Sequence, residues 1–269
     1  QAPDSSRMSE EFFYVQERRQ AICTSHEERG GLRPHGGLSG NTPDAGAVPA
    51  CAAGRGDHGG AAAAFFQTSR EVTMNGYSID PIQDNCYPGT TVLVNKLHIH
   101  DEAALQEAEA LATYVNASKL EQCPLEGVFD FAHYKAIHQF LFSDLYDCAG
   151  QIRTVNLSKK GTDFCPAGEI EPQAKLIFDR LKEQNYFKGL SHDAFVEEIT
   201  DFYDTTNYLH PFREGNGRTQ RAFLTQLIRS AGHDLNWSEV DGDLLMIATI
   251  QAAQGVTDLL RQVLGEAIE

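Results

Sequence analysis

The sequence predicts an all-α domain that carries one short β-hairpin and follows a largely disordered N-terminal segment. Three observations lead to this prediction. Residues 1–73 lack sustained periodicity, several later segments carry apolar residues at helical spacing, and one segment has β-branched residues on both sides of a Gly-containing turn. We therefore expect the folded domain to occupy residues 74–269.

The N-terminal segment, residues 1–73, is rich in Gly, Ala, Pro and charged residues. Such a composition cannot bury enough apolar surface to offset the conformational entropy that is lost on folding. The chain opens with Gln1, and the character of the sequence changes at Met74. We expect this segment to be disordered, or to be upstream sequence that forms no working domain.

Four helices are expected after Met74. Asp101 is suited to cap the first, the second and third are expected at about residues 127–145 and 169–185, and the fourth runs directly into His210. Each has an apolar stripe at three- and four-residue steps, which is typical of a helix packed on one side. The stripes are Leu105, Ala108, Ala112 and Val115; Tyr134, Ile137, Leu141 and Leu145; Ala174, Ile177, Phe178 and Leu181; and Phe195, Ile199, Phe202, Thr206 and Leu209.

The hairpin is expected between the second and third helices. Segments 151–157 and 162–165 contain β-branched or aromatic residues and flank the turn at 158–161, which includes a glycine.

Composition argues against two classes of partner. The chain has 38 acidic and 22 basic residues and a net charge of −16, which repels nucleic acid at long range. No stretch approaches the roughly 20 apolar residues that cross a bilayer, and the N-terminus lacks a basic-then-apolar signal pattern. The six cysteines form no Cys-x-x-Cys pair. We therefore expect a cytoplasmic protein with reduced thiols and no direct contact with nucleic acid or membrane.

The most informative segment is His-Pro-Phe-Arg-Glu-Gly-Asn-Gly-Arg-Thr-Gln-Arg at residues 210–221. Pro211 ends the helix that leads to His210, and a new helix is expected to begin near Asn216 or Gly217. The loop at 213–217 therefore lies at a helix N-terminus, where unpaired N–H groups and the helix dipole favour an anion.

The side chains of this loop add to the expected anion site. Gly215 and Gly217 have no Cβ, so a phosphate can approach the backbone closely, and Asn216 can add a side-chain N–H. Arg218 and Arg221 are three residues apart on one helix face and are expected to form a two-pronged clamp for further phosphates.

Two residues of the segment carry further chemistry. Glu214 is the single carboxylate among these basic groups and is expected to bind the Mg²⁺ that bridges nucleotide phosphates. A neutral His210 can take the proton from an attacking hydroxyl. Phe212 is expected to anchor the loop in the core, and Arg213 is expected to be exposed. A Gly-x-Gly helix start alone would favour the plainer interpretation of an Asn216 cap with solvated arginines, but here twelve consecutive positions each have a role.

The segment matches, position by position, the H-P-F-x-[D/E]-G-N-G-R-x-x-R signature of the Fic family of adenylyltransferases, and residues 74–269 resemble short bacterial Fic toxins. The resemblance implies a Fic-type helical core and transfer of AMP from ATP to a Tyr, Ser or Thr hydroxyl of a protein. It implies that His210 is the general base, that Glu214 binds Mg²⁺ and that the amides of 215–217 hold the α-phosphate. Arg218 would contact the distal phosphates and Arg221 the γ-phosphate.

The resemblance also implies partners. The hairpin is similar to the family's flap, here at about Thr154 to Phe164, which pairs with the target segment as an added strand. Family members are held inactive by a glutamate in an [S/T]-x-x-x-E-[G/N] motif. Only Glu126 and Glu214 precede Gly or Asn in this chain, and Gln122 and His210 stand four residues earlier. A separate small antitoxin is therefore expected, and the relatives it most resembles imply the ATPase subunit of DNA gyrase or topoisomerase IV as the target.

Three alternatives stay open. A Doc-like phosphotransferase has a lysine in place of the second motif glycine, where this chain has Gly217. A non-catalytic module would bind the nucleotide for interaction only. A helix-turn-helix DNA binder is opposed by the net charge.

Overall fold

The computed structural model describes residues 77–79, 85–159 and 162–269, all of which belong to one unit, residues 58–269. The disorder expected for residues 1–73 lies outside the described residues, and the boundary at residue 74 stays a prediction.

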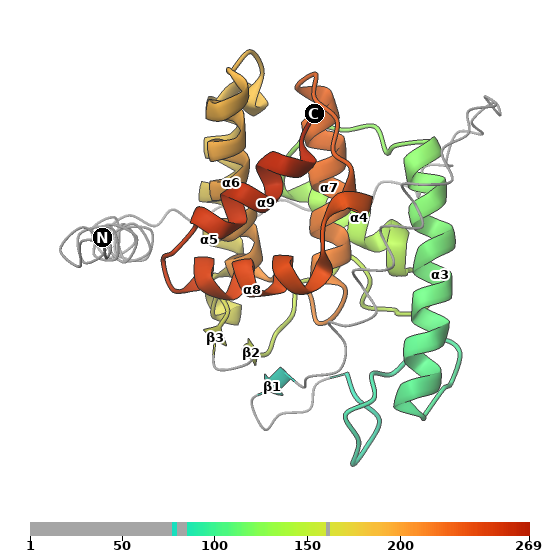
Figure 1. Ribbon diagram of the computed structural model, residues 1–269. Helices are drawn as coiled ribbons and strands as arrows, with labels where there is room; N and C mark the ends of the chain where they lie inside the picture. Colours follow the sequence, from blue (N-terminus) through green and yellow to red (C-terminus); the bar gives the residue numbers. More distant parts are fainter. Residues whose placement is uncertain (1–76, 80–84, 160–161) are drawn as a thin grey trace, which may run out of the picture. The chain divides into compact units, whose positions relative to one another are not determined.

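The described part of the chain is mainly helical, as the sequence predicts (Figure 1). The four expected helices and the helix expected near Asn216 are all present, and two further helices near the C-terminus were not predicted. Their bounds are α3 (Glu102–Gln122), α4 (Phe131–Phe142), α5 (Ile170–Glu183), α6 (His192–Leu209), α7 (Asn216–Ser230), α8 (Gly242–Ala253) and α9 (Asp258–Ala267).

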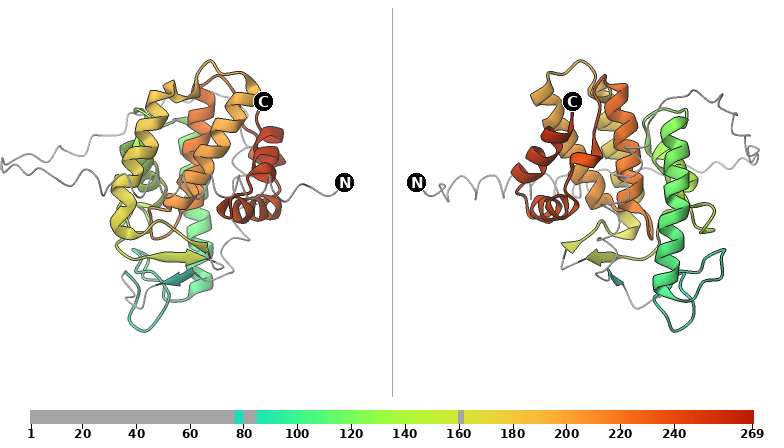
Figure 2. Two further views of the ribbon diagram at one scale, coloured as in Figure 1. Left: turned by 90° about the vertical axis from the view of Figure 1, so that its left-hand side faces the viewer. Right: turned by 45° about the vertical axis from the view of Figure 1, so that its right-hand side comes forward.

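Helix α7 is the centre of the helical core. It packs against both α4 and α6, which lie on either side of it (Figures 1 and 2). Phe223, Leu224, Leu227 and Ile228 of α7 are fully buried. The Phe223 ring meets aromatic rings from α4, α5 and α6 at centroid distances of 5.2–5.8 Å. Because each such side chain contributes about 1.5–3 kcal/mol when buried, this packing fixes the direction of α7.

The predicted stripes hold for α4 and α6 but not for α3. Asp101 caps α3 as expected, with its side chain accepting a hydrogen bond from the Ala104 amide at 2.8 Å. The buried face of α3, however, includes Glu109, Thr113 and Asn116, whereas Val115 is 42% exposed. The stripe prediction was wrong at Val115 because this helix buries polar groups that bond to other elements.

The hairpin is confirmed. Strand β2 (Leu157–Lys159) pairs antiparallel with β3 (Thr162–Asp163), with Lys159 opposite Thr162. A further strand, β1 (Tyr77–Ile79), pairs antiparallel with β2 and places Tyr77 opposite Lys159. The sheet order is β1-β2-β3 (Figure 2). Strand β1 was not predicted, since three residues are too few for an alternating pattern to be recognised.

No helix in the described ranges is both long and apolar enough to cross a membrane. Cys86, Cys148 and Cys165 are free thiols, whereas Cys123 is disulfide-bonded. The prediction of reduced thiols was wrong at Cys123, because separation along the sequence does not limit which cysteines meet in space.

Candidate functional site

The site is built on the short connection between α6 and α7. His210 follows α6 in a left-handed conformation, with φ 39° and ψ 58°, and Gly215 precedes α7 with φ 78°. The Asn216 side chain closes the loop, since its Oδ1 accepts from the Phe212 amide and its Nδ2 donates to the Phe212 carbonyl, both at 2.8 Å. The Asn216 side-chain amide was expected to donate to a phosphate. One of its two N–H bonds is instead used within the loop.

Two buried side chains from other elements brace this connection. Arg153 Nε donates to the His210 carbonyl at 2.8 Å, and the same guanidinium donates to the carbonyls of Val155 and Cys165 at the base of the hairpin. His138 of α4 donates from Nε2 to the Glu214 carbonyl at 3.0 Å, because its Nδ1 accepts from the Gly150 amide. The loop, the hairpin and α4 are thus held as one arrangement.

Of the two loop residues with a predicted degree of burial, Phe212 agrees with the prediction and Arg213 does not. Phe212 is fully buried and stacks on the His138 ring at 3.8 Å, as expected for an anchor. Arg213 was expected to be exposed but is 8% exposed, and its Nη2 lies 3.5 Å from Cys86 Sγ. That prediction was wrong because the segment around Cys86, which shows no periodic pattern, covers the loop.

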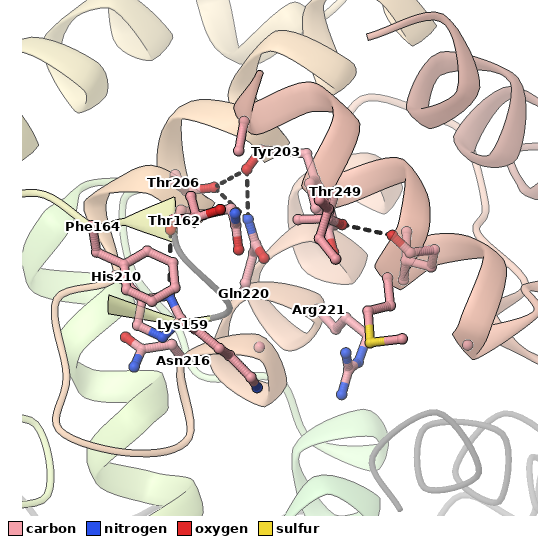
Figure 3. A pocket seen from close by; sticks show the side chains of 17 residues that line it. Lys159, Thr162, Phe164, Tyr203, Thr206, His210, Asn216, Gln220, Arg221 and Thr249 are labelled. Carbon is pink, nitrogen blue, oxygen red and sulfur yellow. Dashed lines mark hydrogen bonds between the residues drawn. The ribbon is translucent and has the colours of Figure 1, made fainter. Parts of the chain in front are cut away.

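A cavity opens at the N-terminus of α7, between α6, α8 and the hairpin (Figure 3). His210, Asn216, Gly217 and Arg221 line it, so four of the predicted site residues meet there. Glu214, Gly215 and Arg218 are not among its lining residues. Lys159, Thr162 and Phe164 of the expected flap also line it. The lining residues that were not predicted for a site are Tyr203, Thr206, Asn207, Gln220, Gly242, Leu245, Met246, Thr249, Ile250 and Ala253.

The two glycines of the loop have different surroundings. A Cβ on Gly215 would stand 2.2 Å from Cζ of Phe142, and the positive φ adds a second reason for glycine there. A Cβ on Gly217 would meet only Arg221 Nη1, at 3.6 Å. Gly215 is therefore required by packing, whereas Gly217 leaves the cavity side of the helix start open.

His210 is placed to accept a proton. Its Nδ1 lies 3.3 Å from the Asn207 carbonyl, which can only accept, so Nδ1 carries the proton of the neutral ring and Nε2 does not. The Phe164 ring stacks on the imidazole at a centroid distance of 3.7 Å. Burial, followed by the charges of Arg153 and Lys159, lowers the pKa of His210 to about 3. The ring is therefore neutral throughout the physiological pH range.

Arg218 points away from its expected position beside Arg221. Its guanidinium pairs with Glu109 of α3, lies 3.3 Å from Thr113 Oγ1 and 3.3 Å from Glu214 Oε1, and covers the Phe142 ring. Since Arg221 lines the cavity and Arg218 does not, the two arginines do not form the expected clamp in this structure.

Glu214 has the features of a single-carboxylate magnesium ligand. The Gly215 amide and Arg218 both donate to Oε1, at 2.9 and 3.3 Å, and the side chain is 26% exposed. Oε2 is thus the oxygen that can face a cation. Mg²⁺ bound with a nucleotide needs only one or two protein carboxylates, since phosphates and water complete its shell. Burial and the charge of Glu109 raise the pKa of Glu214, while Arg218 opposes that shift.

Comparison with known proteins gives a consistent result. The Fic/DOC family model matches residues 128–228. The probable protein adenylyltransferase Fic of Salmonella typhimurium is 37% identical over 182 residues, which cover 68% of this chain and 90% of that protein. The protein adenylyltransferase VbhT of Bartonella schoenbuchensis is 37% identical over 183 residues, but the match spans only 38% of its length. The crystal structure of BepC from Bartonella tribocorum with bound AMPPNP has a TM-score of 0.66 and 30% identity, covering 70% of this chain and 97% of that one.

The two loop glycines allow a matched test of which glycine the packing requires. Gly215→Ala should lower the free energy of unfolding by about 2–5 kcal/mol, because it forces a Cβ onto Phe142 and strains a left-handed residue. Gly217→Ala should keep or slightly raise stability, by up to about 1 kcal/mol, since alanine is favoured in helices. Urea unfolding of both variants measures this, and equal destabilisation by the two substitutions would contradict it.

The protonation state of His210 can be tested directly. Because its pKa is lowered to about 3, the ring should stay neutral as the pH falls from 8 to 5, where an ordinary histidine gains a proton. An NMR titration of the His210 ring signals, assigned with a His210→Gln variant, should show no inflection in that range. A midpoint near the ordinary value would refute the assignment.

Proposed function

The chain belongs to the Fic/DOC family, and on that premise we propose that it is a protein adenylyltransferase that transfers AMP from ATP to a Tyr, Ser or Thr hydroxyl of a target protein. The observation that carries the proposal is His210, which turns its Nδ1 to the Asn207 carbonyl and lines a cavity at the N-terminus of α7. This arrangement combines a general base with a helix end that favours phosphate.

The cavity suggests how ATP is oriented. At the start of α7, Asn216 and Gly217 offer the helix N-terminus to the α-phosphate, with Arg221 of the same helix nearby. The cavity extends to α8, where Leu245, Met246 and Ile250 provide apolar surface. We assign this part to the adenosine, because flat bases bind between apolar side chains with a few polar groups beside them.

The chemistry follows from His210. Nε2 takes the proton of the target hydroxyl, the hydroxyl oxygen attacks the α-phosphorus, and the bond from that phosphorus to the bridging oxygen breaks so that pyrophosphate leaves. Arg153 holds the His210 carbonyl and Phe164 stacks on the ring, so the imidazole keeps its orientation. Mg²⁺, held by Glu214, would neutralise charge on the phosphates.

The hairpin is proposed to position the target. Lys159 and Thr162 lie opposite each other on β2 and β3, and both line the cavity beside His210 (Figure 3). A target segment that adds to this sheet would bring a hydroxyl to His210 through backbone hydrogen bonds.

Two other functions remain as alternatives. A Doc-like phosphotransferase would bind the nucleotide in the reverse direction. Doc-like members of the family have a lysine at the position of Gly217. A non-catalytic module would use the same cavity for nucleotide binding alone. Gly217 supports AMP transfer over the first, and the buried, tautomer-fixed His210 supports catalysis over the second.

His210→Ala separates these functions. The protein and the variant are incubated with ATP, Mg²⁺ and a bacterial lysate, and modified proteins are identified by mass spectrometry. We expect adducts of about 329 Da from AMP rather than about 80 Da from phosphate. The variant should lose about two to four orders of magnitude of transfer while still binding ATP, the scale of a lost general base. Equal labelling by both proteins would refute catalysis by His210.

We further propose that the chain is the toxin of a toxin–antitoxin pair, that it acts in the cytoplasm, and that its target is the ATPase subunit of DNA gyrase or topoisomerase IV. The support is the family resemblance, together with the lack of an [S/T]-x-x-x-E-[G/N] motif in the sequence. Tagged protein expressed with its genomic neighbours should recover a small protein that suppresses transfer. High transfer activity in cells without toxicity would contradict this proposal.

A further inference from the structure

We infer that Glu109 of α3 is a positioning residue that neutralises Arg218 and thereby leaves the Glu214 carboxylate available to nucleotide-bound Mg²⁺. This inference rests on the proposed function, and it concerns a residue outside the family motif.

The contacts form a chain of four side chains. Tyr146 donates its hydroxyl to Glu109 Oε2, Glu109 Oε1 pairs with Arg218, and Arg218 reaches Glu214 Oε1 at 3.3 Å. The side chains of Glu109 and Arg218 are each 9% exposed, whereas that of Glu214 is 26% exposed. The strong ion pair is therefore buried, and the longer contact involves the more exposed carboxylate, that of Glu214.

The charges explain why Glu109 matters for the metal. A buried arginine beside a single carboxylate forms a tight, often bidentate pair, which would occupy both Glu214 oxygens. With Glu109 present, the Arg218 charge is already balanced. The described contact between Arg218 and Glu214 is a longer bond to Oε1. With all three groups ionised, the two carboxylates and one arginine carry one net negative charge, which favours a bound cation.

Glu109 is not simply a stabilising ion pair in this arrangement. Thr113 Oγ1 also lies 3.3 Å from Arg218 Nη1, so Arg218 keeps a partner on α3 when the Glu109 charge is removed. Glu109→Gln keeps the side-chain shape and can still accept from Arg218. The substitution therefore changes the charge balance at Glu214 more than the packing.

The test measures how strongly Mg²⁺ improves the binding of a non-hydrolysable ATP analogue, from Kd values with Mg²⁺ and with EDTA. In Glu109→Gln, this improvement should fall about tenfold, the scale of one charge-assisted interaction, while the Kd in EDTA stays within about twofold. The double variant Glu109→Gln/Arg218→Gln should regain the improvement, since Glu214 then has no arginine to pair with. Glu121→Gln is the matched control, because Glu121 lies on the same helix and pairs with Arg229.

Several results would overturn the inference. They are an unchanged Mg²⁺ effect in Glu109→Gln, an equal loss of binding with and without Mg²⁺, or no recovery in the double variant. Should Glu109→Gln fail to fold by thermal unfolding, Glu109→Asp, which keeps the carboxylate charge that balances Arg218, is measured in its place. Its Mg²⁺ effect should stay within about twofold of the wild-type value, and a loss of about tenfold would overturn the inference. The adducts formed by the wild-type protein test the proposed function separately, so failure of one is distinguishable from failure of the other.

Discussion

The site depends on a steric constraint. Only six residues, among them Pro211, connect the end of α6 at Leu209 to the start of α7 at Asn216, and both helices stay packed in the core. His210 and Gly215 take left-handed conformations at the two ends of α6 and α7, and Gly215 packs its backbone against Phe142. Glycine adopts this conformation freely, but in His210 it persists only because the surroundings hold it, and Arg153 does so through its bond to the His210 carbonyl. The direction of the α7 N-terminus, and with it the position of any bound phosphate, follows from this packing.

The same constraint explains why the motif mixes structural and chemical residues. Phe212 and Gly215 fix the turn, Asn216 closes it through two hydrogen bonds to Phe212, and only then can Gly217 and His210 face a common cavity. A residue type that suggests phosphate binding can therefore serve the backbone instead. Position in the motif alone does not distinguish the two uses, since both glycines have no side chain and only their neighbours differ.

Sequence reasoning recovered the parts whose signal is local. The stripes of α4 and α6, the hairpin and the residues gathered around His210 are visible as periodicity or as a motif. It missed α8, which is apolar on several sides and so shows little periodicity, although Asp241 caps it. It also missed Glu109, because an acidic residue on a helix is ordinarily solvated and nothing in the sequence shows that Arg218, 109 positions later, will face it. The pairing of Glu109 on α3 with Arg218 on α7 depends on how the helices pack together, and it is not encoded in either segment alone.

A net charge of −16 does not by itself exclude a polyanion such as ATP, because the field at a site depends mainly on the groups beside it. Arg153 is bonded to three carbonyl groups, and Arg218 is bonded to two carboxylates, so both serve the structure. Arg221 lines the cavity, where burial lowers the pKa of its guanidinium to about 10. That shift means that the positive charge is costly in the absence of an anion, although it persists at neutral pH. A phosphate in the cavity would offset this cost, so the local field at the start of α7 favours an anion even though the long-range field of the molecule does not.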